Sequence, residues 1–565
     1  MTSRRAGRRI LLAVFLGAWV AGSGLGQAYA QSAPQGDQRL VRARQAMASG
    51  RFAEAVPLYV AVLADQPDDV EALAGATDAL AASGRWQEAM PHLKRLVELR
   101  PYDAVRLTQY AQMLSWSSNT RAKAREALER ALDFDPASVR ARAALAELDS
   151  WSGSTGAALD GFAAVLAAEP TNVTALRGMA NIRAWNGDLL AARDLALQAL
   201  KQEPTNPYTL LTLARVYADL GRSDEALDAL KKIPSGTSYE GLEQIRGDAL
   251  RGSSRWAEDG FSWRDDRSGV AVYRPAVTVS SPVGGRGRAS VWFNPTFFRG
   301  PQGNFSSSRL GVAFDARNDS WRMHAEADGE HYDSTGPIAA DGALEVVYRG
   351  RGPITVAAGF RREAVEDTLV STKGAAVGGD FVGQVRSNLA YASISTTSIR
   401  SHIDATARVG GGVYTGHGLD ANRRWSVGGS IGATLRGSRP YVRIGYAVDY
   451  LSFAFDASAQ PLAPGQRRAG GYFSPTRFLT SVAVGRVAYR LEHDRGEVFA
   501  ESSVGTQNVE TTYGRFGDVG FAGTFATGAI WRPGSMNEVR VEYRYLNVFN
   551  AFRRNTAAIA YRRYF

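Results

Sequence analysis

Side chains that commonly carry out chemistry are sparse in this chain and show no metal-binding spacing. There is no cysteine, which excludes disulfides and thiolate chemistry. No His-x-x-x-His pair and no phosphate-binding Gly-Lys-Ser/Thr occurs. The six histidines are His92, His324, His331, His402, His417 and His493. We therefore expect a protein that is not an enzyme and has no cofactor or metal. A hydrolase with a catalytic Ser-His pair is the alternative, since the members of a catalytic triad need not be adjacent in sequence.

Charged residues instead fall into two ordered rows with a period of two. The first row is Arg322, His324, Glu326, Asp328 and Glu330, and the second is Glu538, Arg540, Glu542 and Arg544. Two carboxylates such as Glu326 and Asp328 could serve glycoside hydrolysis, which needs carboxyl groups about 5 to 9.5 Å apart. The alternative, which we favour, is a solvated face on which Arg322 and His324 balance the carboxylates.

A period of two indicates β-strands, because successive side chains point to opposite faces. The residues between the charges are apolar: Trp321, Met323, Ala325 and Ala327 in the first row, and Val539, Val541, Tyr543 and Tyr545 in the second. A soluble sandwich would show the same alternation. Gly, Ser and Ala on the apolar faces and aromatic residues at segment ends favour a membrane barrel instead. The last segment ends at Phe565, resembling the C-terminal signal of outer-membrane barrels.

The predicted barrel occupies residues 256–565. Crossing strands need about 9 to 11 residues, and bacterial barrels have even strand numbers. With turns and loops, this length predicts about 16 antiparallel strands, with about 14 or 18 as alternatives. A barrel of that size has a lumen wide enough for water. A long loop at residues 456–471 could still plug it.

The region before the predicted barrel has a different period, with a sequence repeat of about 34 residues. Gly50 and Gly84 are one such period apart, as are Pro67 and Pro101, and the phrase Gly-Arg-x-x-Glu-Ala recurs from Gly221. This period resembles the tetratricopeptide repeat, a helix pair that buries its apolar stripe by stacking on its neighbours. We expect about six repeats and a capping helix, from Tyr239 to Leu250, within residues 36–250.

The N-terminal segment predicts where the protein is located, and the distribution of charge bears on its partners. Residues 1–30 have a basic start, an apolar run and Ala28-Tyr29-Ala30, the layout of a secretory signal peptide. Residues 261–565 hold 36 Lys and Arg against 26 Asp and Glu, so the basic excess of +10 lies there. Because an exported chain does not meet nucleic acid, we expect no nucleic-acid partner.

Four phrases of the predicted barrel carry a family resemblance. They are Gly260-Phe261-Ser262-Trp263-Arg264-Asp265-Asp266-Arg267-Ser268-Gly269; Arg361-Arg362 with Val365, Asp367, Leu369 and Ser371; Asn422-Arg423-Arg424-Trp425; and Gly470-Gly471-Tyr472-Phe473-Ser474-Pro475. Together they resemble the C-terminal domain of the cellulose synthase operon protein C family, outer-membrane exporters of bacterial cellulose. The resemblance implies a polysaccharide export porin in the outer membrane, with periplasmic repeats that bind synthase components. The family usually has a longer repeat array, which leaves related exopolysaccharides open.

These observations define the expected site. The ionic residues Arg322, His324, Glu326, Asp328, Glu330, Arg540, Glu542 and Arg544 should line the lumen, because a charge facing lipid costs about 2 to 4 kcal/mol. Tyr472 and Phe473 are candidates for stacking on sugar rings. The expected partners are a polysaccharide chain, synthase components and outer-membrane lipid. A function of a different class is the alternative: an assembly adaptor in the outer membrane whose barrel is mainly an anchor.

Overall fold

The structure is a computed structural model that describes residues 37–234, 241–266, 269–301, 303–333, 338–377, 379–398, 401–436, 440–458, 470–491, 495–510, 519–548 and 552–565. The predicted signal peptide at residues 1–30 and His493 lie outside these residues. The chain divides into two compact units, one built mainly from helices and one that contains the strands. No helix in the described part of the chain is long and apolar enough to cross a bilayer.

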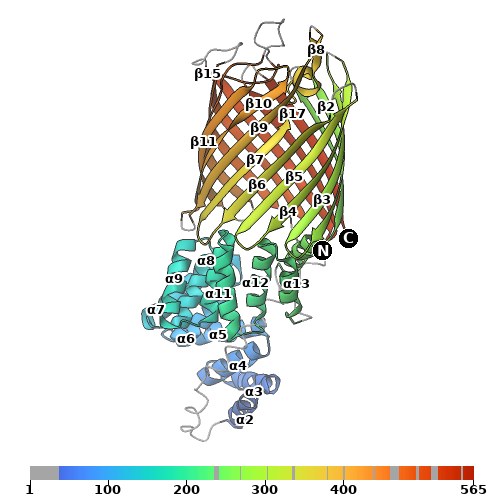
Figure 1. Cartoon of the computed structure of the whole chain (residues 1–565). Helices are drawn as coiled ribbons and strands as arrows, with labels where there is room; N and C mark the ends of the chain where they lie inside the picture. Colours follow the sequence, from blue (N-terminus) through green and yellow to red (C-terminus); the bar gives the residue numbers. More distant parts are fainter. Residues whose placement is uncertain are drawn as a thin grey trace. The chain divides into compact units, whose positions relative to one another are not determined.

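The helical region consists of paired antiparallel helices, as the repeat period predicts (Figure 1). Asp69 and Asp103 cap helices by accepting hydrogen bonds from backbone N–H groups, and Gly50 and Gly84 adopt the positive φ that ends the preceding helix. The helices are α2 (Gln38–Ala48), α3 (Phe52–Asp65), α4 (Val70–Ala82), α5 (Trp86–Leu99), α6 (Ala104–Ser115), α7 (Arg121–Phe134), α8 (Val139–Trp151), α9 (Thr155–Ala168), α10 (Val173–Trp185), α11 (Leu189–Gln202), α12 (Pro207–Asp219), α13 (Ser223–Lys231) and α14 (Leu242–Ser253).

Small residues make the helix contacts close. The alanines at one position of the second helix in successive repeats are completely buried: Ala55, Ala89, Ala124, Ala158, Ala192 and Ala226. A methyl group there lets neighbouring helices approach, so each repeat buries its apolar stripe against the next. The predicted capping helix corresponds to α14, which begins at Leu242; Tyr239 lies outside the described residues.

The strands form a closed antiparallel barrel, because β1 pairs with both β2 and β17. The ring strands are β1 (Trp256–Asp266), β2 (Ala271–Val283), β3 (Gly287–Arg299), β4 (Phe305–Arg317), β5 (Trp321–Tyr332), β6 (Ala339–Arg349), β7 (Ile354–Ala364), β9 (Asp380–Thr397), β10 (Ile403–His417), β11 (Asn422–Arg436), β12 (Tyr441–Phe453), β13 (Arg477–Arg490), β14 (Gly496–Glu510), β15 (Val519–Gly534), β16 (Asn537–Val548) and β17 (Phe552–Tyr564). The expectation of 16 antiparallel strands is thus confirmed, with one extra short strand, β8 (Ala375–Val377), that pairs only with β9.

The two faces of the barrel wall differ in chemistry. Apolar side chains on one face remain open to the surroundings, among them Val291, Leu310, Val312, Trp321 and Val541, each about half exposed. An apolar outer band is the surface that a barrel presents to lipid. The opposite face carries the ionic side chains of β5 and β16.

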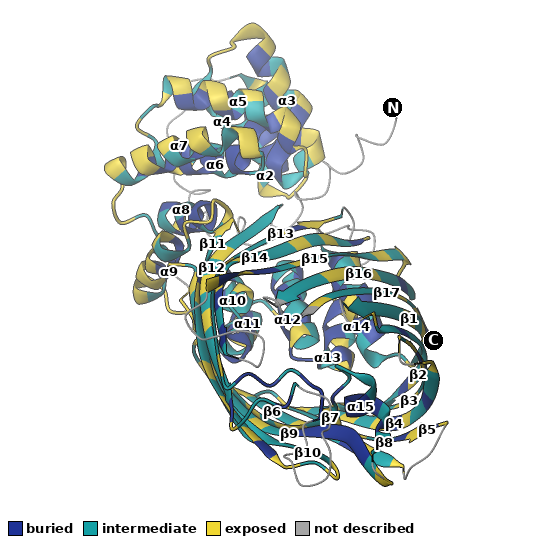
Figure 2. Cartoon of the chain, turned by 90° about the horizontal axis from the view of Figure 1, so that it is seen from above, coloured by how far each residue is buried: buried dark blue, intermediate teal, exposed yellow. Residues whose placement is uncertain are grey.

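A short helix departs from the expected pattern. After β7 the chain forms α15 (Leu369–Lys373), which lies inside the ring of strands in Figure 2. Five residues cannot form a stable helix by propensity alone. Thr368 and Ser371 stabilise its start with a reciprocal capping box, and Gly374 ends it at a φ of 84°.

Candidate functional site

The predicted row on β5 lies on the ionic face and forms a buried charge cluster at one end of the strand. Glu330 is completely buried and accepts hydrogen bonds from the hydroxyls of Ser307 and Tyr332, both at 2.8 Å. Arg386 from β9 binds it at 3.1 Å. Groups from β4, β5 and β9 therefore share this carboxylate, which fixes three strands to one another.

Two further carboxylates complete the cluster. Asp341 binds Arg309 at 2.6 Å and Arg386 at 2.9 Å, and Asp328 lies 3.2 Å from Arg309. Buried charges are tolerated when they are paired and hydrogen-bonded in this way. Asp328 and Glu330 are thus held by arginines and belong to a rigid part of the wall.

The other end of the row is more open. The side chain of Arg322 is 64% exposed and lies 3.9 Å from Glu345. His324 contacts Asp315 at 3.0 Å and Glu326 at 3.4 Å. Part of the predicted row is therefore accessible to water, as a channel lining requires.

The row on β16 shows the same gradation. Glu538 is nearly buried and binds Arg532 at 2.8 Å and Arg540 at 2.7 Å. Arg544 and Glu542 form a 2.8 Å pair in which both side chains are exposed. These residues alternate along the strand with outward-facing Val541 and Tyr543.

The segment that contains α15 is fixed to the wall by two acidic residues. Glu366 binds Arg264 of β1 at 2.9 Å and Arg274 of β2 at 2.8 Å. Burial acts to raise the pKa of Glu366, but Arg274 and Arg264 outweigh it and lower the pKa to about 2. Asp367 binds Arg554 of β17 at 3.1 Å. We call residues 365–374 the inner segment.

Tyr472 and Phe473 lie beside this inner segment. The backbone N–H of Phe473 donates to Asp367 at 3.1 Å. Tyr472 is 3% exposed, and its ring stacks on Tyr414 at 5.2 Å and shares an apolar cluster with Val365. The ring of Tyr472 therefore has little free face in this arrangement, and its role in sugar stacking stays a prediction.

The described ends of the long loop, residues 454–458 and 470–476, belong to the same arrangement. Ala457 accepts a hydrogen bond from Gly471 at 2.8 Å and donates one to Ser474 at 2.7 Å, and both Ala457 and Ser474 are buried. Residues 459–469, the middle of the predicted plug, lie outside the described residues. Ala457 also shares the apolar cluster of Val365, and Phe473 donates to Asp367, so both described ends of the loop lie beside the inner segment.

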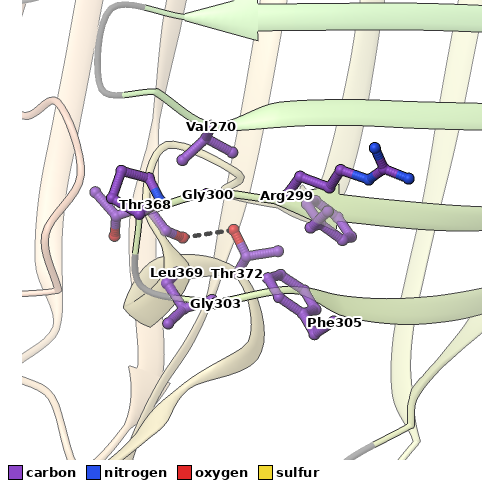
Figure 3. A pocket seen from close by; sticks show the side chains of 10 residues that line it. Val270, Arg299, Gly300, Gly303, Phe305, Thr368, Leu369 and Thr372 are labelled. Atoms are coloured by element: carbon purple, nitrogen blue, oxygen red, sulfur yellow. Dashed lines mark hydrogen bonds between the residues drawn. The ribbon is translucent and has the colours of Figure 1, made fainter.

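A cavity of about 270 Å³ separates α15 from the neighbouring strand ends (Figure 3). Val270, Phe298, Phe305 and Leu369 give it an apolar lining. Thr372 turns its hydroxyl back to the carbonyl of Thr368 at 2.6 Å. The side of α15 toward β2–β4 is therefore not tightly packed. Its other contacts are the close approach of Gly383 in β9 to Val370 and the ion pairs of the residues that precede it.

Sequence reasoning did not identify Glu366, Arg264, Arg274 or Arg554 as site residues. A signal existed, because the four phrases of the family resemblance meet here. Arg264 is in the first, Asp367 in the second, Asn422 in the third and Phe473 in the fourth. Asn422 is completely buried and donates to the carbonyl of Phe455 at 2.8 Å.

Two patterns that could carry metal or hydrolase chemistry were compared with the described residues. No group of three or more His, Asp or Glu side chains among them could hold a metal ion. Gly428 to Gly432 fit the Gly-x-Ser-x-Gly pattern of hydrolases, but they lie within strand β11. A nucleophile elbow requires a sharp turn between a strand and a helix.

Comparisons with known structures give weak matches. A structure described as a bacterial polysaccharide outer membrane secretin shares 11% identity, covers 55% of this chain and 99% of its own, and has a TM-score of 0.42. A tetratricopeptide repeat protein from Parabacteroides merdae shares 15% identity, covers 38% of this chain and 83% of its own, and has a TM-score of 0.32. TM-scores this low do not support any conclusion about function.

Family models give the clearer result. No curated protein matches the chain. Residues 46–107 and 184–236 match the tetratricopeptide repeat. Residues 344–517, from β6 into the connection after β14, match the cellulose synthase operon protein C C-terminus and include three of the four phrases above. The barrel thus resembles the C-terminal domain of this family over residues 344–517, and tetratricopeptide repeats precede it.

Proposed function

We propose that this chain is an outer-membrane porin that exports an exopolysaccharide, with a neutral β-glucan of the cellulose type as cargo and the repeats as a periplasmic scaffold for synthase components. The observation that carries the proposal is a closed barrel with an apolar outer band and an ionic inner face. The family match supports the polysaccharide class.

Export through such a barrel needs a wet path and no chemistry on the cargo. Exposed ionic side chains such as Arg322, Glu542 and Arg544 would exchange hydrogen bonds with sugar hydroxyls. Because most inner charges are paired with one another, the lining would bind a neutral chain only loosely. Synthesis of the polymer would supply the force that moves it.

The charge balance bears on the cargo. A cationic polymer such as partly deacetylated poly-glucosamine needs an excess of carboxylates along its path, whereas residues 261–565 contain 10 more Lys and Arg than Asp and Glu (36 against 26). We therefore rank a neutral glucan first, an anionic polysaccharide second and a cationic one last.

Planar-bilayer recordings of the full chain test the proposal. We expect step-like currents with weak selectivity or anion preference, and a current block by cellohexaose that increases with its concentration. Strong cation selectivity would reverse the cargo ranking. A protein that inserts but never conducts would contradict the porin function.

A second candidate function is an assembly adaptor whose barrel serves as an anchor. The inner segment favours it, because Glu366 and Asp367 fix this segment inside the ring. The two functions differ in whether the barrel conducts after the segment is released. Currents that remain absent in the Glu366→Gln variant described below would support the adaptor.

A further inference from the structure

Three tryptophans recur at one position of successive repeats. Trp116, Trp151 and Trp185 follow one another at the spacing of the repeat, and each is followed by a small polar residue, Ser117, Ser152 or Asn186. Trp116 is the C-cap residue of α6, and Trp151 is the last residue of α8. Trp116 packs partly against the core of the repeats, whereas Trp151 and Trp185 remain exposed and are not required for stacking.

The structure places the first two of these tryptophans along one groove. A shallow depression is bordered by Trp116 and Trp151 together with Gln112, Ser115 and Glu147. A second depression shares Gln112 and Trp116 and extends inward to the buried residues Trp86, Gln109 and Thr77. Each encloses only about 10 Å³, so a ligand would lie across this surface. We call it the tryptophan groove.

The aromatic rings of the groove are positioned by their neighbours. Trp86 is nearly buried and meets Trp116 edge to face, with ring centres 5.7 Å apart and planes at 86°. Trp151 is 42% exposed. Edge-to-face contact holds the Trp116 ring in one orientation, and Trp151 offers indole surface to a ligand.

The charged groups of the groove are neutralised within the protein. Glu147 forms an ion pair with Arg177. Arg106 binds Asp78 at 2.6 Å and also donates to Gln109 at 2.9 Å. These bonds link the first helices of neighbouring repeats. Thr77, Ser115 and Gln109 are buried and hydrogen-bonded within the protein. What is left for a ligand is the half-buried Trp116 ring, the exposed Trp151 ring and the amide of Gln112.

We propose that the tryptophan groove binds a neutral β-linked hexose polymer. The ring C–H groups of such a sugar give it an apolar face that packs on indole, while its hydroxyls bond to the amide of Gln112. A tryptophan that recurs once per structural repeat suits a ligand built of identical units, whereas a folded protein partner has no such period. The identity of the polymer rests on the proposed function, but the groove is a separate site.

Calorimetry with cellohexaose on the full chain, in a detergent without sugar headgroups, tests the site. Replacing both tryptophans, in the variant with Trp116→Ala and Trp151→Ala, should weaken the affinity about tenfold or more, because buried aromatic anchors dominate such contacts. Trp151→Ala alone, at an exposed position, should weaken it several-fold and guards against misfolding of the double variant. Tyr102→Ala is the matched control: Tyr102 is 75% exposed on the same repeats but outside the groove, and its loss should change nothing.

An unchanged affinity in both folded tryptophan variants would overturn the proposal. So would unchanged glucan affinity combined with loss of a co-purifying periplasmic protein, which would make the groove a protein site. The block of channel current by cellohexaose distinguishes an error in the assignment of the groove from an error in the proposed cargo. If wild-type current is blocked but the tryptophans do not affect binding, only the groove is wrong. If wild-type protein neither binds cellohexaose nor is blocked by it, the proposed cargo is wrong as well.

Discussion

Glu366 is the residue on which the inner segment most depends, because it neutralises Arg264 and Arg274 together. Glu366→Gln leaves two guanidinium groups without a carboxylate in a largely buried site, where losing one partner costs about 3 to 5 kcal/mol. We expect the inner segment to loosen and bilayer currents to become larger or noisier. The heat-dependent gel shift of a folded barrel should remain.

A matched control uses an exposed pair on the same inner face. Glu542 binds Arg544 at 2.8 Å with both side chains exposed, so Glu542→Gln should cost less than about 1 kcal/mol and should not loosen the inner segment. Equal behaviour of the two variants would show that the Glu366 contacts do not hold the segment.

The pKa of Glu366 leads to a separate prediction about pH. Its folded-state pKa of about 2 lies below the ordinary value of 4.5. The stability that the ionised carboxylate contributes is therefore fully present above pH 4.5 and is lost only as pH falls toward about 2. Currents recorded between about pH 7 and about pH 5 should show no titration of Glu366. A transition in that range that disappears in Glu366→Gln would contradict this assignment.

At the scale of elements, two glycines separate the effect of backbone strain from that of close packing. Gly383 of β9 has a φ of 121°, and an added Cβ would lie 2.1 Å from the carbonyl oxygen of Val370 in α15. Gly379 has a φ of 93° with open space around it. Gly379→Ala should cost only the strain of about 1 to 2 kcal/mol, whereas Gly383→Ala should also displace α15.

Limited proteolysis of the folded protein measures this difference. We expect cleavage near Lys373 to become faster in Gly383→Ala than in Gly379→Ala, because displacement of α15 exposes its backbone. Equal cleavage rates would mean that α15 is not held against β9 by this close approach.

The same elements show what could be predicted from the sequence. The strands of the ionic rows are predictable, because their two faces meet different surroundings. Apolar and ionic residues therefore alternate along the sequence with a period of two. Strand number follows from length. α15 is not predictable, since five residues carry no period and its stability comes from a capping box and tertiary contacts. The pair between Arg264 and Glu366 spans 102 residues and leaves no local pattern.

At the scale of the whole molecule, the barrel and the repeats have independent sources of stability. The barrel closes through backbone pairing of β1 with β17, for example of Trp256 with Tyr564 and of Asp266 with Arg554. This pairing involves no residue of the repeats. The repeats bury their alanines against each other, as in other arrays whose units contact only their neighbours. The ring of strands should therefore fold without the repeats, although residues 184–191, 214–230 and 243–253 belong to the same compact unit as the strands.

Deletion of residues 36–250, with the predicted signal peptide retained, tests this independence and the scaffold role together. The shortened chain should still migrate faster unboiled than boiled and should conduct in bilayers like the full chain, because its ring of strands is complete. Polymer export in cells should fall sharply, since the repeats that would bind synthase components and the tryptophan groove are gone. A misfolded product would contradict the independence of the barrel. Export at the parental rate would instead show that a folded barrel suffices for transport, and the repeats would then need a different function.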